Sequence, residues 1–480
     1  MECPLSLGAK VCGMWVLFLA CWDVAVLLLV YTCLFRNTVK ARDDQTQGNL
    51  ISLGTFLCQI LHKCDVETRI LASSGLDFLI CACLFAGKEE MIMAIYLDYN
   101  ATTPHDPAVI EVMRPFLETH FGNPSSAHAF GQVTHRAVEA ARKQVADLLN
   151  CLPDEVIFTS GGTEANNFAI KGLAFARSDL GNHIVTTQVE HPAVTEVCAW
   201  LETQGFEVTY LPVDETGRVD VGDLEAALLP ETILISVMHA NNEVGTLQPI
   251  EDIATLASRH DIAFHTDAAQ SIGKLGVDVQ ALGVDLLSMA GHKVYAPKGV
   301  GALFVREGVE LEKFMHGAGH EKGWRAGTEN VLQVVGLGKA CEIISRDLET
   351  HAEHLIGLRD RLENALLSGV SDVRTNGHLE HRLPNTLSVS FLDVDADDVL
   401  AEMSDDVAAS AGAACHSGEV NVSHVLTAMK VPMEWARGTL RLSVGRFTTC
   451  EEIDRAGDVI VKAVKKLRVK GRAENAEREA

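Results

Sequence analysis

The chain has 480 residues, a length that suits two or three domains, and 47% of them are hydrophobic, as expected for a protein with a large core. Its formal net charge of −25 argues against a nucleic-acid-binding surface, which needs clustered Lys and Arg, and is explained by solubility. Eight of the 13 cysteines precede residue 93. The other five show no CxxC pair or disulfide spacing, so a reduced, cytoplasmic main body is expected.

The N-terminal extension, residues 1–92, contains a long apolar run. Residues 11–35 are apolar except for Asp23 and exceed the roughly 20 residues that span a bilayer. More basic residues follow this run than precede it, which would leave the main body on the cytoplasmic side. Alternatively, the folded body begins at Met91 or Met93 and the upstream part is a mistranslated leader. Membrane attachment is therefore expected only if the apolar run belongs to the mature protein.

From residue 93 short apolar runs alternate with helical patterns such as 134–150. This alternation predicts an α/β domain over residues 93–345, with a mainly parallel sheet covered by helices. Beyond it, a long charged helix leads into mixed strands and helices, so a smaller α+β domain is expected over residues 346–468, followed by a disordered tail over 469–480. Ligands of such a sheet bind at the carboxyl ends of its strands, so functional residues should directly follow the apolar runs.

The first such position is the segment 158–172, in which a strand meets a Ser-Gly-Gly-Thr turn and then a helix. Gly162 lets the backbone approach a ligand closely, and the helix N-terminus with Thr163 suits a phosphate. A tight turn with a threonine cap explains the same pattern. After the next strand, the His191 imidazole could stack on a flat ring, although a structural histidine also fits there.

Two later strands end in residues that together suit one cofactor. IAFHTDAAQ places Asp267 at a strand end, and DLLSMAGHKV places Lys293 at another. A lysine beside the core has a lowered pKa, which suits Schiff-base formation with an aldehyde. A neighbouring aspartate could hold a protonated pyridine nitrogen, and pyridoxal phosphate needs this pair. Taken singly, Lys293 could be a surface-loop lysine and Asp267 a helix cap.

The run SAGAACHSGEVNVSHVL, residues 410–426, places Cys415 among small residues that cannot build a core. A loop rich in Gly, Ala and Ser bends easily, so its thiol could reach into a pocket and then swing out to an acceptor. The alternative is a spare surface thiol. No metal site is expected, because Cys415 and His416 lack further ligands at suitable spacing.

A series of motifs follows in order from about residue 95 to 468: YLDYNATTP, GNPSSAH, TSGGTEANN, EHPAV, HANNEVGTLQP, HTDAAQSIGK, GHKVYAPKGVGAL, RAGTEN, GAACHSG and LRLSVGRFT. Together they resemble the cysteine desulfurases of the NifS/IscS family, pyridoxal-phosphate enzymes of the class V aminotransferase superfamily. The resemblance implies fold type I, with a mainly parallel seven-stranded sheet in the large domain and a smaller α+β C-terminal domain. It also implies a homodimer.

The resemblance gives roles to the residues around the cofactor ring. Lys293 would carry the cofactor as a Schiff base, and Asp267 would pair with the pyridinium nitrogen. Gln270 would bond the ring's phenolic oxygen. His191 would stack on the ring and move protons, and Asn242 would line the site.

Other residues would hold the phosphate, namely Gly162, Thr163 and His292, with Thr328 reaching in from a second subunit. The sequence departs from the family at one such position, because Ala290 stands where many members have a serine that contacts the phosphate. One hydrogen bond to a charged group contributes about 1.5–3 kcal/mol, so somewhat weaker cofactor retention is expected.

For the substrate, the resemblance implies that Arg441 binds the carboxylate of L-cysteine, with Asn242 beside it, and that Cys415 is the nucleophile. Cys415 and Arg441 are 26 residues apart, a span that resembles the long-loop branch of the family. L-Cysteine would yield L-alanine and a persulfide on Cys415, and the sulfur would pass to an acceptor such as an iron–sulfur scaffold protein.

Three other functions stay open at the level of sequence. A selenocysteine lyase uses the same apparatus, and Ala-Ala-Cys-His-Ser resembles some of those enzymes. An aminotransferase has no use for Cys415. A catalytically inactive scaffold for cluster assembly, tethered by the apolar run, would have no need of Lys293, Asp267 and Cys415.

Overall fold

The structure is a computed structural model that describes residues 94–416 and 419–479. The candidate membrane span at 11–35, and with it the alternative interpretation of residues 1–92 as a leader, lies outside these residues. Within the described ranges, no helix combines the length and the apolar character needed to cross a bilayer.

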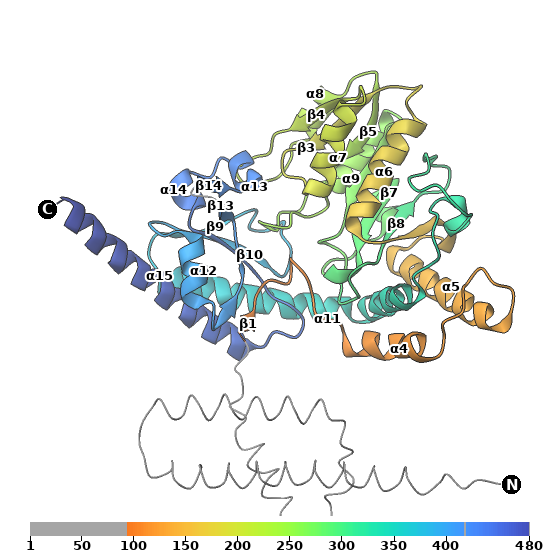
Figure 1. Ribbon diagram of the computed structural model, residues 1–480. Coiled ribbons are helices and arrows are strands. Elements are labelled where there is room, and N and C mark those ends of the chain that lie inside the picture. Colours follow the sequence, from red (N-terminus) through yellow and green to blue (C-terminus); the bar gives the residue numbers. More distant parts are fainter. Residues whose placement is uncertain (1–93, 417–418, 480) are drawn as a thin grey trace, which may run out of the picture. The chain divides into compact units, whose positions relative to one another are not determined.

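A seven-stranded sheet with the strand order β2-β8-β7-β6-β5-β3-β4 forms the centre of the larger part (Figure 1). Neighbouring strands from β7 to β4 are parallel, and only β8 runs antiparallel to its two neighbours. The strands are β2 (Val156–Thr159), β3 (His183–Thr187), β4 (Glu207–Leu211), β5 (Thr232–Ser236), β6 (Ala263–Asp267), β7 (Leu286–Ala290) and β8 (Gly301–Val305). The predicted α/β fold with a mainly parallel seven-stranded sheet is confirmed.

The inner strands are apolar throughout because helices cover both faces of this sheet. Successive residues of a strand enter opposite cores: Ile235 and Phe264 belong to one apolar cluster, and Leu234 and Ala263 to the other. α6 and α7 contribute to the second cluster, and the other helices contribute to the first. These helices are α4 (Pro107–Glu118), α5 (Ala129–Leu149), α6 (Gly162–Ala176), α7 (Pro192–Glu202), α8 (Val221–Ala227), α9 (Ile250–Arg259) and α10 (Val279–Leu282).

The smaller part is built on an antiparallel sheet with the order β12-β15-β10-β9. It has its own apolar core, to which α11, α12 and α15 contribute. Its elements are β1 (Ile95–Tyr96), β9 (Val373–Asn376), β10 (Thr386–Phe391), α12 (Ala396–Met403), β11 (Val407–Ala408), β12 (Ser410–Ala411), β13 (Ala413–His416), β14 (Glu419–Val422), α13 (His424–Ala428), α14 (Met433–Ala436), β15 (Thr439–Ser443) and α15 (Cys450–Glu479).

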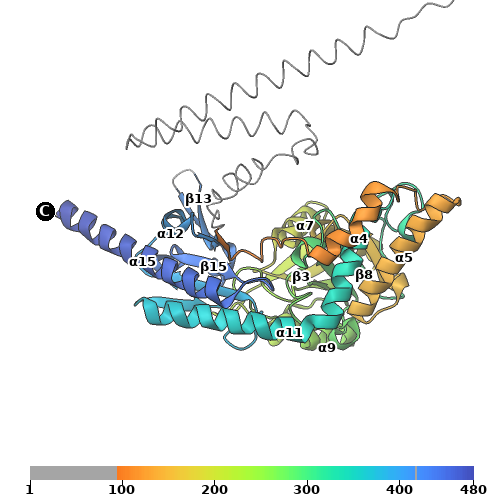
Figure 2. The same cartoon turned by 90° about the horizontal axis from the view of Figure 1, so that it is seen from below.

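The helix α11 (Val331–Gly369) belongs to both parts, as Figures 1 and 2 show. Its first turns place Leu337 and Ile344 in a core of the large sheet, and its later turns place Leu358 and Leu362 in the core of the small one. The predicted domain boundary at residues 345 and 346 falls inside this helix. In addition, β1 pairs with β11, so the described part of the chain begins in the smaller part and then forms the larger one.

The C-terminal helix α15 continues to Glu479, so the prediction of a disordered tail over 469–480 is wrong for residues 469–479. The segment is rich in Lys, Arg, Glu and Ala, which are strong helix formers, and Gly471 is the residue that disfavours the helix most. Figure 1 shows the end of α15 projecting beyond the small sheet.

Candidate active site

Several of the predicted site residues lie at one edge of the large sheet. β6 ends at Asp267, and β7 is followed by the 3₁₀ turn η2 (Gly291–Lys293). His191 follows β3, and Asn242 follows β5. Parallel strands end at the same edge, so residues far apart in sequence meet there. The charges of Asp267 and Lys293 both affect the pKa of His191, as expected for close neighbours.

The Lys293 amine is enclosed and bonded to backbone oxygens. Its Nζ donates to the carbonyl oxygen of Asn100 and, over 2.9 Å, to that of Ala101. Burial, and then the positive charge of Arg441, lower the pKa of Lys293 to about 8. The lowered pKa makes the unprotonated amine, the form that attacks an aldehyde, more accessible than it is for an exposed lysine.

Asp267 is the last residue of β6, and only 7% of its surface is exposed. One carboxylate oxygen accepts a hydrogen bond of 2.6 Å from Nδ2 of Asn166 on α6. The other accepts one of 2.9 Å from the backbone N–H of Ala269. These bonds fix a buried carboxylate at the sheet edge, where it can pair with a cationic ring nitrogen.

Gln270 belongs to a buried polar network centred on Asn100. Its Nε2 donates to the Asn100 carbonyl oxygen over 2.9 Å, and its Oε1 accepts from Nζ of Lys274 over 2.7 Å. Lys274 also donates to Oδ1 of Asn100 over 3.2 Å, and Nδ2 of Asn385 donates to the same oxygen over 3.0 Å. Because Lys293 donates to the Asn100 carbonyl too, one residue links Gln270, Lys274 and Lys293.

Two histidines of the site have lowered pKa values. The N-cap residue of α7, His191, accepts the backbone N–H of Ala193 at Nδ1 over 3.1 Å, so its neutral ring carries the proton on Nε2. Partial burial lowers the pKa of His191, and burial with the charge of Lys293 lowers that of His292 to about 4. Nδ1 of His292 lies 3.3 Å from Oγ1 of Thr102.

The N-terminus of α6 lies against the end of β7. A Cβ on Gly162 would lie 3.3 Å from the methyl carbon of Ala290, so a larger side chain at residue 162 would press on the strand. The glycine thus lets the first N–H groups of α6, with the exposed Thr163, reach the sheet edge as an anion-binding group. Ala290, the position that departs from the family, lies at this same N-terminus.

Arg441 on β15 brings the small domain into the site. Its Nη2 donates to Oδ1 of Asp98 over 2.9 Å and to Oγ of Ser410 over 3.0 Å, and its Nη1 donates to the Asn242 carbonyl oxygen over 3.3 Å. Its Nε is buried and has no hydrogen-bond partner among the residues described. An unsatisfied guanidinium N–H beside the site suits a carboxylate ligand.

Cys415 lies on β13, opposite Val420 of β14. The position of its side chain lies outside the part of the chain that the structure describes. At the base of this strand pair, the backbone N–H of Ser423 donates to the Gly412 carbonyl oxygen over 3.1 Å. The Ser423 hydroxyl also donates to a carboxylate oxygen of Glu243, next to Asn242, so the base of the pair is bonded to the large domain.

Glu190, directly before His191, is a buried acid that the sequence analysis did not single out. It accepts hydrogen bonds from Oγ1 of Thr187 over 2.8 Å and from the backbone N–H of Met238 over 3.0 Å. Burial raises the pKa of Glu190 to about 8. Its carbonyl oxygen lies 2.9 Å from Nε2 of His424 on α13, a second bond between the base of the strand pair and the large domain.

One predicted residue, Thr328, is exposed on the loop before α11. Conversely, Asp98 and Asn100 join the site although the sequence analysis used their motif, YLDYNATTP, only for the family resemblance. A run of polar residues directly after a short apolar strand was the signal that could have pointed to them.

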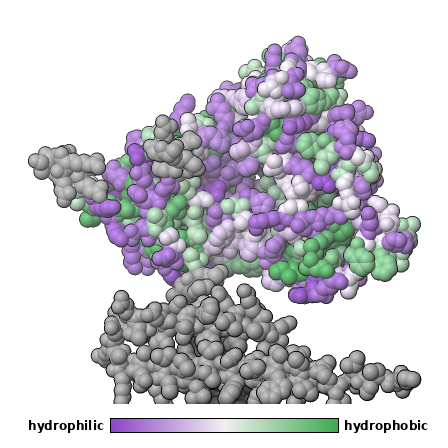
Figure 3. Space-filling model, in the orientation of Figure 1, coloured by the Kyte–Doolittle hydropathy of each residue, from purple (hydrophilic) through white to green (hydrophobic). Residues whose placement is uncertain are grey.

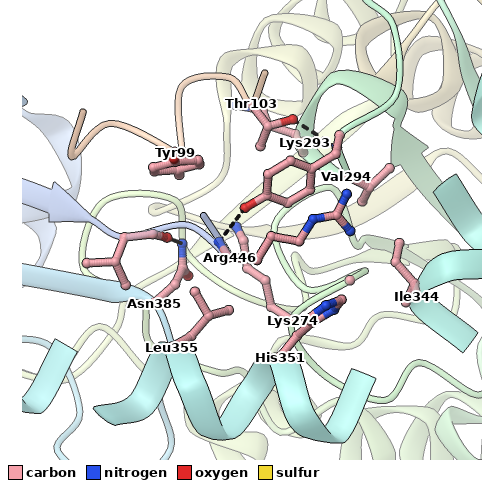
Figure 4. Close-up of a pocket in the computed structure, with 13 residues that line it drawn as sticks. Tyr99, Thr103, Lys274, Lys293, Val294, Ile344, His351, Leu355, Asn385 and Arg446 are labelled. Atoms are coloured by element: carbon pink, nitrogen blue, oxygen red, sulfur yellow. Dashed lines mark hydrogen bonds between the residues drawn. The ribbon is translucent and has the colours of Figure 1, made fainter. Parts of the chain in front are cut away.

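Behind Lys293 lies a small cavity with room for about one water molecule (Figure 4). Lys274 and Asn385 of the Asn100 network line it, together with Tyr295 and Arg446. Lys293 therefore shares the lining of this cavity with other basic side chains.

The model of the aminotransferase class-V family matches residues 95–456, which include every residue of this site. The chain belongs to this family. Among curated relatives, the cysteine desulfurase IscS of Dictyoglomus turgidum is 49% identical over 375 residues, 78% of this chain and 95% of the relative. The cysteine desulfurase IscS of Methanosarcina thermophila is 48% identical, over 78% of this chain and 93% of the relative.

Solved structures agree with these relatives. A NifS-like protein superposes with a TM-score of 0.73 at 38% identity, covering 78% of this chain and 99% of its own. SspA, solved in complex with cysteine, superposes with a TM-score of 0.65 at 40% identity, covering 74% of this chain and all of its own. The family resemblance of the motifs is thereby confirmed over the main body.

Proposed function

We propose that this chain is a pyridoxal-phosphate-dependent cysteine desulfurase that converts L-cysteine to L-alanine and transfers the sulfur to Cys415. The observation that carries the proposal is the enclosed Lys293 amine, with a pKa of about 8, at the same sheet edge as the fixed carboxylate of Asp267. IscS relatives at 46–49% identity, all described as cysteine desulfurases, support the substrate.

The residues fit pyridoxal phosphate on structural grounds. Lys293 offers a weakly basic amine, Asp267 a fixed negative charge and Gln270 an N–H donor. The N-terminus of α6, at Gly162 and Thr163, offers N–H groups for a phosphate, with His292 nearby. When bound, the cofactor supplies an electron sink beside the α-carbon of the substrate.

Some side chains around that centre bind the substrate, and others transfer protons. Arg441 binds the substrate carboxylate, using the Nε that has no partner among the described residues. Lys293 takes the α-proton at Nζ, and His191 exchanges a proton at Nε2 because its Nδ1 is bonded to the backbone. Asn242 lines the site beside Arg441 and fixes its orientation through its carbonyl oxygen.

Cys415 acts as the nucleophile in its thiolate form. Its sulfur bonds to the sulfur of cysteine while the carbon–sulfur bond of the substrate breaks, and a proton completes the methyl group of alanine. The balance is L-cysteine plus the Cys415 thiol to L-alanine plus the Cys415 persulfide. A sulfur-acceptor protein, such as an iron–sulfur scaffold, then takes the outer sulfur.

Replacing Cys415 by Ala tests this function. We expect C415A to retain the visible absorbance of the bound cofactor and to lose formation of alanine and sulfide from cysteine. Cys450→Ala is the matched control, because Cys450 is an exposed free thiol at the start of α15. Sulfide formation by C415A at the wild-type rate would refute the role of Cys415. Comparing the turnover of cysteine with that of selenocysteine would distinguish a desulfurase from a selenocysteine lyase.

We also propose a homodimer, in which Thr328 of each copy reaches the phosphate of the other. An apolar patch over α4 and α5 supports it (Figure 3). The side chains of Leu117 and Phe121 are 70% and 80% exposed, and Phe130 stacks on Phe121. Such a patch on a large domain is typical of an interaction surface.

The cytoplasm is the proposed location of the catalytic body. Supporting it, the cysteines among the described side chains, Cys151, Cys198, Cys341 and Cys450, are all free thiols.

A further inference from the structure

Lys274 is a buried basic residue to which the proposed chemistry gives no role. Only 6% of its surface is exposed, and its Nζ bonds to two amide oxygens, Oε1 of Gln270 and Oδ1 of Asn100, rather than to a carboxylate. Burial, with the charges of Lys293 and Arg441, lowers its pKa well below the usual value. An amine in such a place costs free energy, so its two bonds indicate a specific task.

The neighbours of Gln270 decide which way its amide group faces. The Asn100 carbonyl oxygen can only accept a hydrogen bond, so the NH₂ of Gln270 must face it. The amide oxygen then points to Lys274, which supplies the donor over 2.7 Å. With Oε1 satisfied, the NH₂ group keeps a second hydrogen that is free to serve a ligand at the sheet edge.

We propose that Lys274 is a positioning residue that locks the Gln270 amide with its NH₂ toward the phenolic oxygen of the cofactor ring. The inference rests on the proposed function, because only a ring oxygen at that place gives the orientation its effect. Without the Lys274 amine, Oε1 of Gln270 becomes a buried oxygen without a donor, and the amide rotates to find one. The N–H bond to the ring is then lost although Gln270 itself is intact.

The cavity behind Lys293 supports this arrangement. Lys274 and Lys293 line it from neighbouring elements, and Figure 4 draws both with Asn385, which donates to the same Asn100 oxygen as Lys274.

A double-mutant cycle tests the proposal with Lys274→Met, Gln270→Leu and the combined variant. The readouts are the dissociation constant for pyridoxal phosphate added to the cofactor-free protein and the pH midpoint of the visible absorbance of the bound cofactor. We expect Q270L to weaken binding about tenfold, K274M to weaken it by at least about threefold, and both to move the midpoint in the same direction. The double variant should match Q270L alone, because the two residues act through one bond.

Two further variants complete the experiment. Lys465→Met is the control, because Lys465 is an exposed lysine of α15. It removes the same amine, and it should leave the dissociation constant and the pH midpoint unchanged. Lys274→Gln restores an N–H donor one bond closer to the backbone, so it should fold where K274M does not and fall between K274M and wild type. Wild-type binding and midpoint in K274M, weaker binding in K274Q than in Q270L, or losses that add in full to those of Q270L, would overturn the proposal. A wild-type protein that shows no cofactor absorbance would refute the proposed function itself.

Discussion

The two halves of the site hold their residues by different means. On the large-sheet side, Asp267 ends β6 and Lys293 lies in the 3₁₀ turn that follows β7, and two hydrogen bonds fix each of them. On the small-domain side, Arg441 lies on an antiparallel strand, and Cys415 lies on a strand pair whose base is joined to the large domain through Ser423 and His424. The difference fits the proposed mechanism, in which one half fixes the reacting centre and the other supplies the groups that bind the substrate and accept its sulfur.

The strongest test of the fixed half is Lys293→Ala. We expect turnover of cysteine to fall by at least about a thousandfold, because the variant loses both the amine that holds the cofactor and the group that moves the α-proton. The visible absorbance of the bound cofactor should disappear with it. Lys465→Ala is the control, and a normal cofactor spectrum in K293A would show that another residue holds the ring.

A smaller effect is expected on the small-domain side from Arg441→Ala. The KM for cysteine should rise by about 100-fold, since a charge-assisted bond to the substrate carboxylate is lost, while the cofactor spectrum stays close to that of the wild type. Arg437→Ala is a matched control, because Arg437 forms an exposed ion pair of 2.9 Å with Asp395 that contributes little. An unchanged KM in R441A would show that Arg441 does not bind the substrate carboxylate.

The contrast between the halves also explains which residues could be predicted. Asp267 and Lys293 stand at the ends of apolar runs, and the geometry of a parallel sheet brings such ends together without further information. The ion pair of Arg441 with Asp98 joins residues 343 positions apart, and no local sequence pattern indicates it. For Lys274, the sequence shows only a lysine after a glycine, and its burial depends on the packing of Asn100 and Gln270 around it.

Local sequence patterns predicted the fold only in part as well. The alternation of strands and helices indicated the large sheet, whereas the pairing of β1 with β11 and the passage of α11 through both cores arise only from tertiary packing. In the segment 469–479, the many charged residues suggested disorder, although Lys, Arg, Glu and Ala all favour a helix.

The smallest expected effect concerns Glu190, which sits where the two halves meet. Between pH 4.5 and about 8 the folded chain keeps a proton on Glu190 that the unfolded chain has released, so the free energy of unfolding falls as pH rises through this window. Glu190→Gln should reduce that slope by about 1–3 kcal/mol over the window, measured by denaturant unfolding at several pH values. Glu434→Gln, at an exposed position, should leave the slope as it is, and an unaltered slope in E190Q would contradict the raised pKa.

Mass spectrometry of the cysteine-treated protein tests the central claim most directly. After incubation with pyridoxal phosphate and L-cysteine and digestion without reductant, the peptide that contains Cys415 should carry one additional sulfur atom, in step with the alanine formed. The peptide that contains Cys450 should be unchanged. Alanine formation in the first turnover with no additional sulfur on Cys415 would contradict the account.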